Sequence, residues 1–118
     1  MKYMMLIYET ETDFAARTNE NKDRFWVAWR AYHKALVDAG VFVGGNALQP
    51  YSTATTVRSK GGNRQVQDGP YAETKEQLGG YIILELPSLD AALDWASRCP
   101  AAATGAVEIR PVFTTEAG

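Results

Sequence analysis

Two residues of this 118-residue chain, its only histidine and one aspartate in a rigid turn, have the chemistry that proton transfer requires. An unperturbed imidazole titrates near neutrality, so His33 suits a general base. Asp68 opens an Asp-Gly-Pro turn sequence, in which glycine supplies a positive φ and proline fixes its own. A carboxylate held in this way could orient the imidazole. We therefore take His33 and Asp68 as the candidate catalytic residues.

Each candidate also has a structural interpretation. His33 lies beside the apolar stripe of a predicted helix. It could therefore be a half-buried structural residue, with its ring packed against neighbouring side chains and a ring nitrogen hydrogen-bonded to the backbone. Asp68 also fits a turn former that bonds local N–H groups. The Asp68→Asn variant separates the two interpretations. Unchanged ligand binding with a lowered melting temperature would favour the turn former.

Aromatic and polar side chains supply the candidate substrate-binding residues. Tyr8 and Trp29 could wall an aromatic pocket, and Tyr71, Glu73 and Lys75 form a polar set behind the Asp-Gly-Pro turn. The structural alternatives are core or interface packing for the aromatic residues and solvated loop positions for the polar ones.

Known signatures of cofactor and metal chemistry are missing from the sequence. It has no phosphate loop, no dinucleotide fingerprint and no paired metal-ligand spacing, so we expect neither cofactor nor metal. The three Gly-Gly pairs fit turns and bulges. The lone cysteine, Cys99, precedes a proline at a predicted helix end and fits a buried inert thiol better than a nucleophile.

Composition narrows the partners and the compartment. A net charge of −2 without a Lys/Arg run argues against nucleic-acid binding. No apolar run is long enough to span a membrane, and the amino-terminal run is too short for a signal peptide, so we expect a cytoplasmic protein. The length fits a single domain over residues 1–118.

The candidate residues must be positioned by a mixture of strands and helices. The stripe Phe25, Trp29, Tyr32 and Leu36 predicts a helix over 22–39, capped by Asn21 and ended by Gly40. A second helix begins after Ser88 and stops at Pro100. Strands are predicted over 3–8, 41–43, 54–60, 64–67, 81–86 and 107–113, with a loop over 68–78.

This order is that of an α+β, ferredoxin-like βαββαβ fold with an inserted β-hairpin. Both helices would cover one face of an antiparallel sheet. The strands are apolar on both sides, as Met4 and Leu6 against Met5 and Ile7 show. An apolar second face predicts a homodimer in which two sheets pack face to face.

The run Asp-Gly-Pro-Tyr-Ala-Glu-Thr-Lys-Glu-Gln-Leu-Gly-Gly-Tyr, residues 68–81, resembles the signature of the DGPF group of YCII-related (YciI-like) proteins. Tyr71 stands where that group usually has Phe. Further matching pieces lie at 1–4, 39–45, 47–50, 54–58 and 107–111, so the resemblance covers nearly the whole chain. It implies a dimeric α/β-barrel of ferredoxin-like protomers.

The resemblance also implies two functions between which the sequence does not decide. The wider family is suspected of enzymatic activity through a His–Asp pair in a cleft. The family histidine counts onto Trp29, one turn before His33, so either His33 reaches the same cleft or the pair is absent. A cofactor-free acid–base enzyme or small-molecule binder is one hypothesis. The other is a regulatory or interaction module, because some members lie beside genes for extracytoplasmic-function sigma factors.

Overall fold

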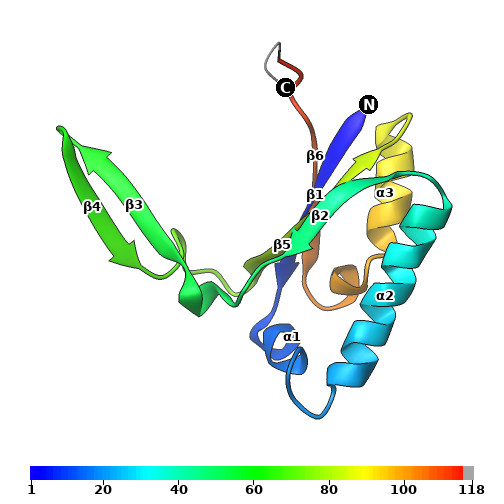
Figure 1. Ribbon diagram of the computed structural model, residues 1–118, viewed down its shortest axis with the longest axis horizontal. Coiled ribbons are helices and arrows are strands. Elements are labelled where there is room, and N and C mark those ends of the chain that lie inside the picture. Colours follow the sequence, from blue (N-terminus) through cyan, green and yellow to red (C-terminus); the bar gives the residue numbers. More distant parts are fainter. Residues whose placement is uncertain (116–118) are drawn as a thin grey trace.

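A four-stranded antiparallel sheet with helices across one face forms the body of the molecule (Figure 1). The computed structural model describes residues 1–115. The strands lie in the order β2-β5-β1-β6. The predicted ferredoxin-like order, with a hairpin inserted between its two halves, is confirmed. The sheet consists of β1 (Lys2–Glu9), β2 (Phe42–Ala47), β5 (Gln77–Glu85) and β6 (Ala106–Pro111).

The two helices predicted from the apolar spacing occur where they were expected. The helical elements are α1 (Glu11–Ala16), α2 (Lys22–Asp38), α3 (Leu89–Ser97) and the 3-10 turns η1 (Tyr51–Thr53) and η2 (Pro100–Ala103). The hydroxyl of Ser88 accepts a hydrogen bond from the Ala91 N–H, as a cap should. Within residues 1–115, none of the helices combines the length and apolarity needed to cross a bilayer.

The predicted cap of α2 is wrong. Asn21 precedes the helix, but its side chain makes no capping bond, because its backbone (φ −94°, ψ 4°) lacks the extended conformation that capping needs. The Asn19 side chain instead accepts a hydrogen bond from the Asn21 N–H at 2.8 Å. Gly40, with φ at +73°, follows the helix as predicted.

The core lies between the sheet and helices α2 and α3. Alternate residues of β1, Tyr3, Met5 and Ile7, are buried against the helices. From α2, Tyr32 and Leu36 fill the other side of this layer. This alternation places the remaining residues of β1 on the opposite sheet face, over which no described helix lies (Figure 1).

Two of the sheet strands are longer than predicted because irregular pairing accommodates their glycines. The pairing of β1 with β5 shifts after Ile7, which faces Gly80, so that Tyr8 faces Leu78. The pairing of β2 with β5 shifts between Phe42 and Gly44. Strand β5 therefore begins at Gln77, inside the predicted 68–78 loop, and β2 continues to Ala47.

The inserted hairpin stands away from the body, and we call it the arm. Its strands β3 (Thr55–Lys60) and β4 (Asn63–Asp68) form a separate two-stranded sheet. The turn between them uses Gly61 and Gly62, with φ of +57° and +82°, as the hairpin prediction required. In Figure 1 the arm and the helix-free face of the sheet enclose an open angle.

Candidate functional site

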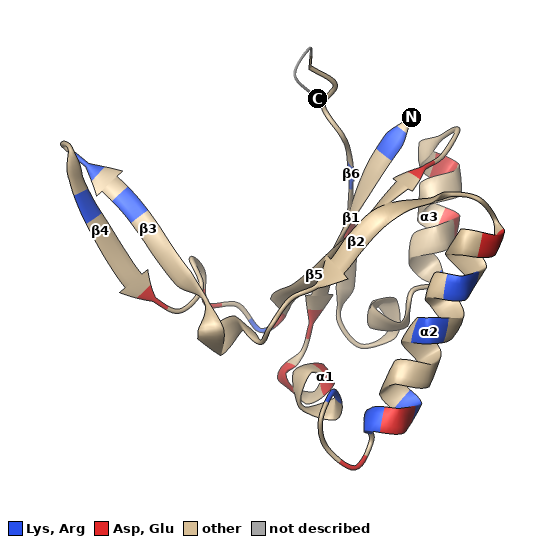
Figure 2. Cartoon of the chain, viewed as in Figure 1, with Lys and Arg blue, Asp and Glu red and all other residues tan. Residues whose placement is uncertain are grey.

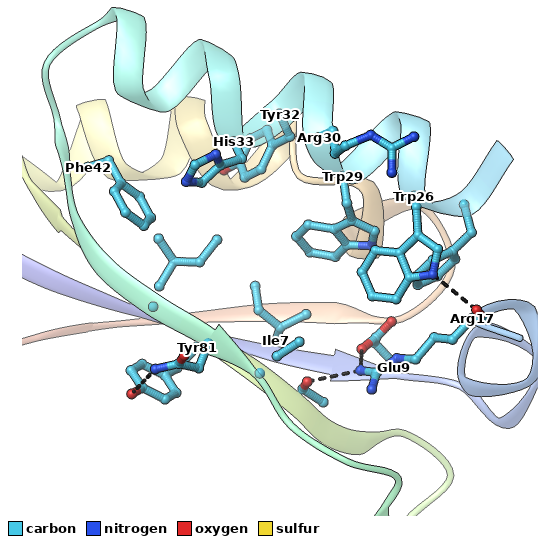
Figure 3. Close-up of a pocket in the computed structure, with 17 residues that line it drawn as sticks. Ile7, Glu9, Arg17, Trp26, Trp29, Arg30, Tyr32, His33, Phe42 and Tyr81 are labelled. Carbon is cyan, nitrogen blue, oxygen red and sulfur yellow. Dashed lines mark hydrogen bonds and ion pairs between the residues drawn. The ribbon is translucent and has the colours of Figure 1, made fainter. Parts of the chain in front are cut away.

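A cavity of about 280 Å³ lies between α2 and the sheet (Figure 3). Its walls are mainly aromatic and apolar, and ionisable side chains lie among them. The apolar lining residues are Ile7, Phe25, Trp26, Trp29, Tyr32, Phe42 and Ile82, and the ionisable side chains are those of Glu9, Arg17, Arg30 and His33.

The helical repeat of α2 explains why one helix supplies both core and cavity. Tyr32 and Leu36, four residues apart, are buried in the core. Trp26, Trp29 and His33 follow at steps of three and four along the adjacent side of the helix, and all three line the cavity. Trp29 and Tyr32 meet edge to face, with ring centroids 6.1 Å apart. Because Tyr32 and Leu36 pack in the core, α2 is held in the rotation about its axis at which Trp26, Trp29 and His33 face the cavity.

One end of the cavity holds a buried ion pair. Arg17 Nη2 donates to Glu9 Oε1 at 2.7 Å, and the side chains of Glu9 and Arg17 are only 4% and 11% exposed. The same guanidinium donates to the Gly79 carbonyl at 3.0 Å and to that of Leu48. Its Nε is buried and has no hydrogen-bond partner within the described residues. Arg17 therefore keeps one donor that nothing in residues 1–115 satisfies.

The local sequence explains how this pair is placed. Glu9 is the last residue of β1 and continues the inward alternation of Tyr3, Met5 and Ile7. Gly79 lies close by on β5, and a Cβ there would collide with the Glu9 carboxylate, so glycine leaves room for the acid. Trp26 Nε1 donates to the Arg17 carbonyl at 3.0 Å and ties the end of α1 to α2.

Burial gives Glu9 unusual acid–base character. Desolvation raises the pKa of its carboxyl above the ordinary 4.5, although the hydrogen bond and charge of Arg17 oppose the rise. Burial therefore favours the protonated form of this carboxyl more than solvent would.

The other end of the cavity carries His33. Its ring meets Phe42 of β2 edge to face, with centroids 4.7 Å apart. The side chain is exposed, not half-buried as the structural interpretation expected, and it lines the cavity. Figure 3 shows His33 and Phe42 toward one end, with Glu9, Arg17 and Trp26 toward the other. An exposed ring that lines the cavity is accessible to solvent and to a ligand.

Of the predicted site residues, the structure brings only His33 and Trp29 to the cavity. Tyr8 belongs to the opposite sheet face, because it alternates with Ile7 and Glu9. Asp68 ends the arm strand β4 and is exposed, and no residue of 68–76 lines the cavity. Glu73 and Lys75 are exposed in the loop that follows. One chain alone therefore does not assemble the predicted His33–Asp68 pair.

The Asp-Gly-Pro bend is held by backbone contacts. The Gly69 N–H donates to the Ala54 carbonyl at 2.7 Å, and the Thr56 hydroxyl donates to the Gly69 carbonyl at 2.9 Å. Within residues 1–115 the Asp68 side chain makes no hydrogen bond, so the local bonding expected of a turn former is not seen there. Tyr71 is 71% exposed and lies 4.9 Å from the Arg58 guanidinium.

The sequence interpretation missed Glu9, Arg17, Phe42 and Arg30. An inward-facing acid at the end of an alternating strand could have identified Glu9. No local sequence pattern indicates a role for Arg17, because its hydrogen-bond partners lie up to 62 positions away in the sequence. Cys99 is buried as expected, and burial raises the pKa of its thiol to about 11, so it stays protonated at neutral pH. Among the described residues, no three His, Cys, Asp or Glu side chains gather as a metal site would require.

Comparison with known proteins identifies relatives over the full length of the chain. The model of the YCII-related domain matches residues 1–116. An uncharacterized protein of Rhizobium meliloti (strain 1021) is 37% identical over 120 residues, which are all of this chain and 97% of that protein.

A solved structure shares the fold. It is the 5-chloro-2-hydroxyhydroquinone dehydrochlorinase TftG from Burkholderia phenoliruptrix AC1100, in complex with 2,5-dihydroxybenzoquinone. The TM-score is 0.58 at 14% identity, and the alignment covers 99% of this chain and 98% of that one. At this identity the likeness establishes the fold alone.

Proposed function

The chain belongs to the YCII-related family, and from that premise we propose that its cavity binds a small, flat aromatic or quinonoid molecule and promotes proton transfer on it without a cofactor. The proposal rests on one observation: the cavity has aromatic walls, and at one end it holds the buried carboxyl of Glu9, whose pKa is raised by burial.

Size and lining both favour a ligand of one or two rings. A volume of about 280 Å³ lies at the lower end of the range of small-molecule pockets. Trp26 and Trp29 offer indole faces and edges, and Phe42 adds another ring from β2. Aromatic rings pair with one another in stacked or edge-to-face arrangements, so a planar ligand gains contact here that a branched aliphatic one does not.

The ionisable groups at the two ends suit a ligand with oxygen atoms across a ring. Glu9 can exchange a proton with a hydroxyl or an enol, and the positive charge of Arg17 beside it favours an oxygen that gains negative charge. At the other end His33 can serve as a second acid or base, beside the cation of Arg30. Such groups favour tautomerisation or elimination at a hydroxylated ring.

The activity for which TftG is named supports the ligand class. That protein is named for an action on a chlorinated hydroxyhydroquinone, and its structure holds a dihydroxybenzoquinone. The cavity is open, which favours a small-molecule ligand.

A thermal-shift screen with phenols, hydroquinones and hydroxybenzoquinones tests the proposal. Ligand binding to the folded state raises the melting temperature. We expect hits in this set and a loss of their shift in Trp29→Leu. The His33→Gln variant should reduce turnover or binding of a hit, whereas Lys34→Gln, the next exposed residue of α2 and outside the cavity, should not. If no planar compound shifts the melting temperature, or if Trp29→Leu keeps the response, the proposal is wrong.

A further inference from the structure

The charges that line the cavity do not balance. Among the described residues of its lining, the cations are Arg17 and Arg30, and the only acid is Glu9. The Glu9 carboxylate lies 2.7 Å from the Arg17 guanidinium and neutralises it. Arg30 is therefore left as an excess positive charge at the cavity, although the whole chain has a net charge of −2.

Arg30 has no acidic partner of its own. It takes part in none of the ion pairs found within residues 1–115. Lys34, one helical turn further along α2, pairs with Asp38 at 2.6 Å. The residues three and four positions from Arg30 include no acid; they are Trp26, Val27, His33 and Lys34. The Arg30 side chain is exposed, so its guanidinium is available to a negatively charged group of a ligand. Figure 2 shows Lys and Arg as blue segments along α2.

Arg30 lies on the side of α2 that forms the cavity wall. It follows Trp26 by four residues and precedes His33 by three, a spacing that places the three side chains on one side of the helix. Figure 3 shows Arg30 on α2 between His33 and Trp26. Glu9 belongs to β1, so a ligand in the cavity has Arg30 on its helix wall and Glu9 on its sheet wall.

A carboxylate is the group that an arginine in this setting recognises best. The guanidinium is a planar fork whose N–H groups match the two oxygens of a carboxylate. A carboxylate on an aromatic ring can lie in the plane of that ring, so the ligand stays flat enough for the space beside Trp26 and Trp29. The imidazole of His33, next along the helix wall, can donate an N–H to the same group.

The ion pair at the end of the cavity determines how such a ligand is oriented. Arg17 is already engaged by Glu9 and by the carbonyls of Leu48 and Gly79, so it has less to offer a carboxylate than Arg30 has. An ionised Glu9 also repels a second carboxylate, which directs the acidic group of the ligand away from it. The part of the ring that carries hydroxyls is then left facing Glu9.

We propose that Arg30 determines the specificity of the cavity, and that the preferred ligand is a hydroxylated aromatic carboxylic acid whose carboxylate pairs with Arg30 while a ring hydroxyl faces Glu9. The inference rests on the proposed binding of planar aromatic molecules and narrows their class. Neutral phenols and quinones occupy the same cavity with lower affinity, because they leave the charge of Arg30 unpaired.

A matched pair of ligands tests the proposal on the full chain. The probes are 2,5-dihydroxybenzoic acid and 2,5-dihydroxybenzamide, which have the same ring, hydroxyls and shape but differ by one negative charge. NMR titration of the indole N–H signals of Trp26 and Trp29 gives the dissociation constant of each probe. At neutral pH we expect the acid to bind about tenfold more tightly than the amide.

Two variants of α2 locate the origin of this preference. In Arg30→Gln the ratio of the two dissociation constants should fall below about threefold, because the acid binds more weakly while the amide is unaffected. Lys34→Gln removes the same charge one turn away, at an exposed residue outside the cavity lining. This control should keep at least about two thirds of the preference, since charges of exposed residues are screened by solvent and salt.

The outcomes separate this inference from the function on which it rests. If both probes bind the wild-type protein with equal affinity, Arg30 does not select the ligand, and the proposed function stands. Equal losses of the preference in Arg30→Gln and Lys34→Gln would also overturn the inference, since the general charge of the surface would then explain it. If neither probe nor any neutral planar compound binds, the proposed function is wrong and the inference fails with it.

Discussion

Glu9 is the residue on which the chemistry of the cavity depends most. It is a carboxyl with 4% exposure, and its charge is balanced by a single arginine. Such a pair costs desolvation energy, and removing one partner leaves the other charge buried and uncompensated. The structure keeps this arrangement at the wall of an open cavity, where a ligand can reach it.

Replacing Glu9 with Gln should therefore lower the free energy of unfolding by about 3 kcal/mol, because Arg17 would lose its counterion. Denaturant unfolding at pH 7 measures the change. Glu73→Gln, at an exposed loop position, is the control and should stay within about 0.5 kcal/mol of the wild type. Equal stability of the Glu9 variant and the wild type would contradict the uncompensated-charge argument.

The raised pKa of Glu9 also predicts a dependence of stability on pH. Between pH 4.5 and the raised pKa, the folded protein binds more protons than the unfolded chain. The contribution of Glu9 to the free energy of unfolding should therefore fall as the pH rises through this window. The Glu9→Gln variant should lack this pH dependence. Carboxyl NMR titration should find the pKa of Glu9 above 4.5. A titration midpoint below 4.5 would reverse the sign of this contribution.

Gly79 is the second residue with a specific steric role. A methyl group there would collide with the Glu9 carboxylate, so Gly79→Ala should destabilise the protein by about 2 kcal/mol and disturb the ion pair. Gly44→Ala is the matched control, since Gly44 lies in β2 with nothing within 4 Å of the added group. Thermal unfolding of the two variants distinguishes them. A neutral Gly79→Ala would show that the acid can move aside.

At the scale of elements, one side of α2 packs into the core and the adjacent side lines the cavity. Leu36 is fully buried, so Leu36→Ala should cost about 2–5 kcal/mol. Val37, the next residue, is 48% exposed, and Val37→Ala should cost less than about 1 kcal/mol. Chemical denaturation measures both. Similar losses in the two variants would mean that α2 is rotated from the orientation that carries Trp26, Trp29 and His33 to the cavity.

The elements themselves were predictable because their signals are local. The spacing of Phe25, Trp29, Tyr32 and Leu36 predicted α2 to within one residue at its end, and Ser88 marked the start of α3. Strand β5 was cut short because Gly79-Gly80 is typical of a turn, whereas here a shift in pairing keeps both glycines in the sheet.

The site was less predictable, since it depends on contacts between distant segments. His33 and Trp29 were found because their chemistry is visible on a single helix. Arg17 has no local signal, and its role follows from its bonds to Glu9, Leu48 and Gly79. The rigid turn at Asp68 predicts a fixed carboxylate, but it contains no information about where the arm positions that side chain relative to His33.

At the scale of the whole molecule, the cavity and the arm lie on opposite sides of the sheet. The cavity lies under α2, whereas the arm and the helix-free face open to the other side (Figure 1). Ligand binding can therefore be tested separately from the self-association that the sequence predicts for the helix-free face. A variant of the arm, such as Val66→Glu, changes no residue of the cavity lining.

The most direct test of the central claim is an NMR titration of the three tryptophan indole N–H signals with 2,5-dihydroxybenzoquinone. Trp26 and Trp29 line the cavity, whereas Trp95 lies on α3 outside its lining. We predict saturable shifts of the Trp26 and Trp29 signals and the smallest change at Trp95. Unmoved signals at saturating ligand, or a response centred on Trp95, would contradict a planar-ligand site beneath α2.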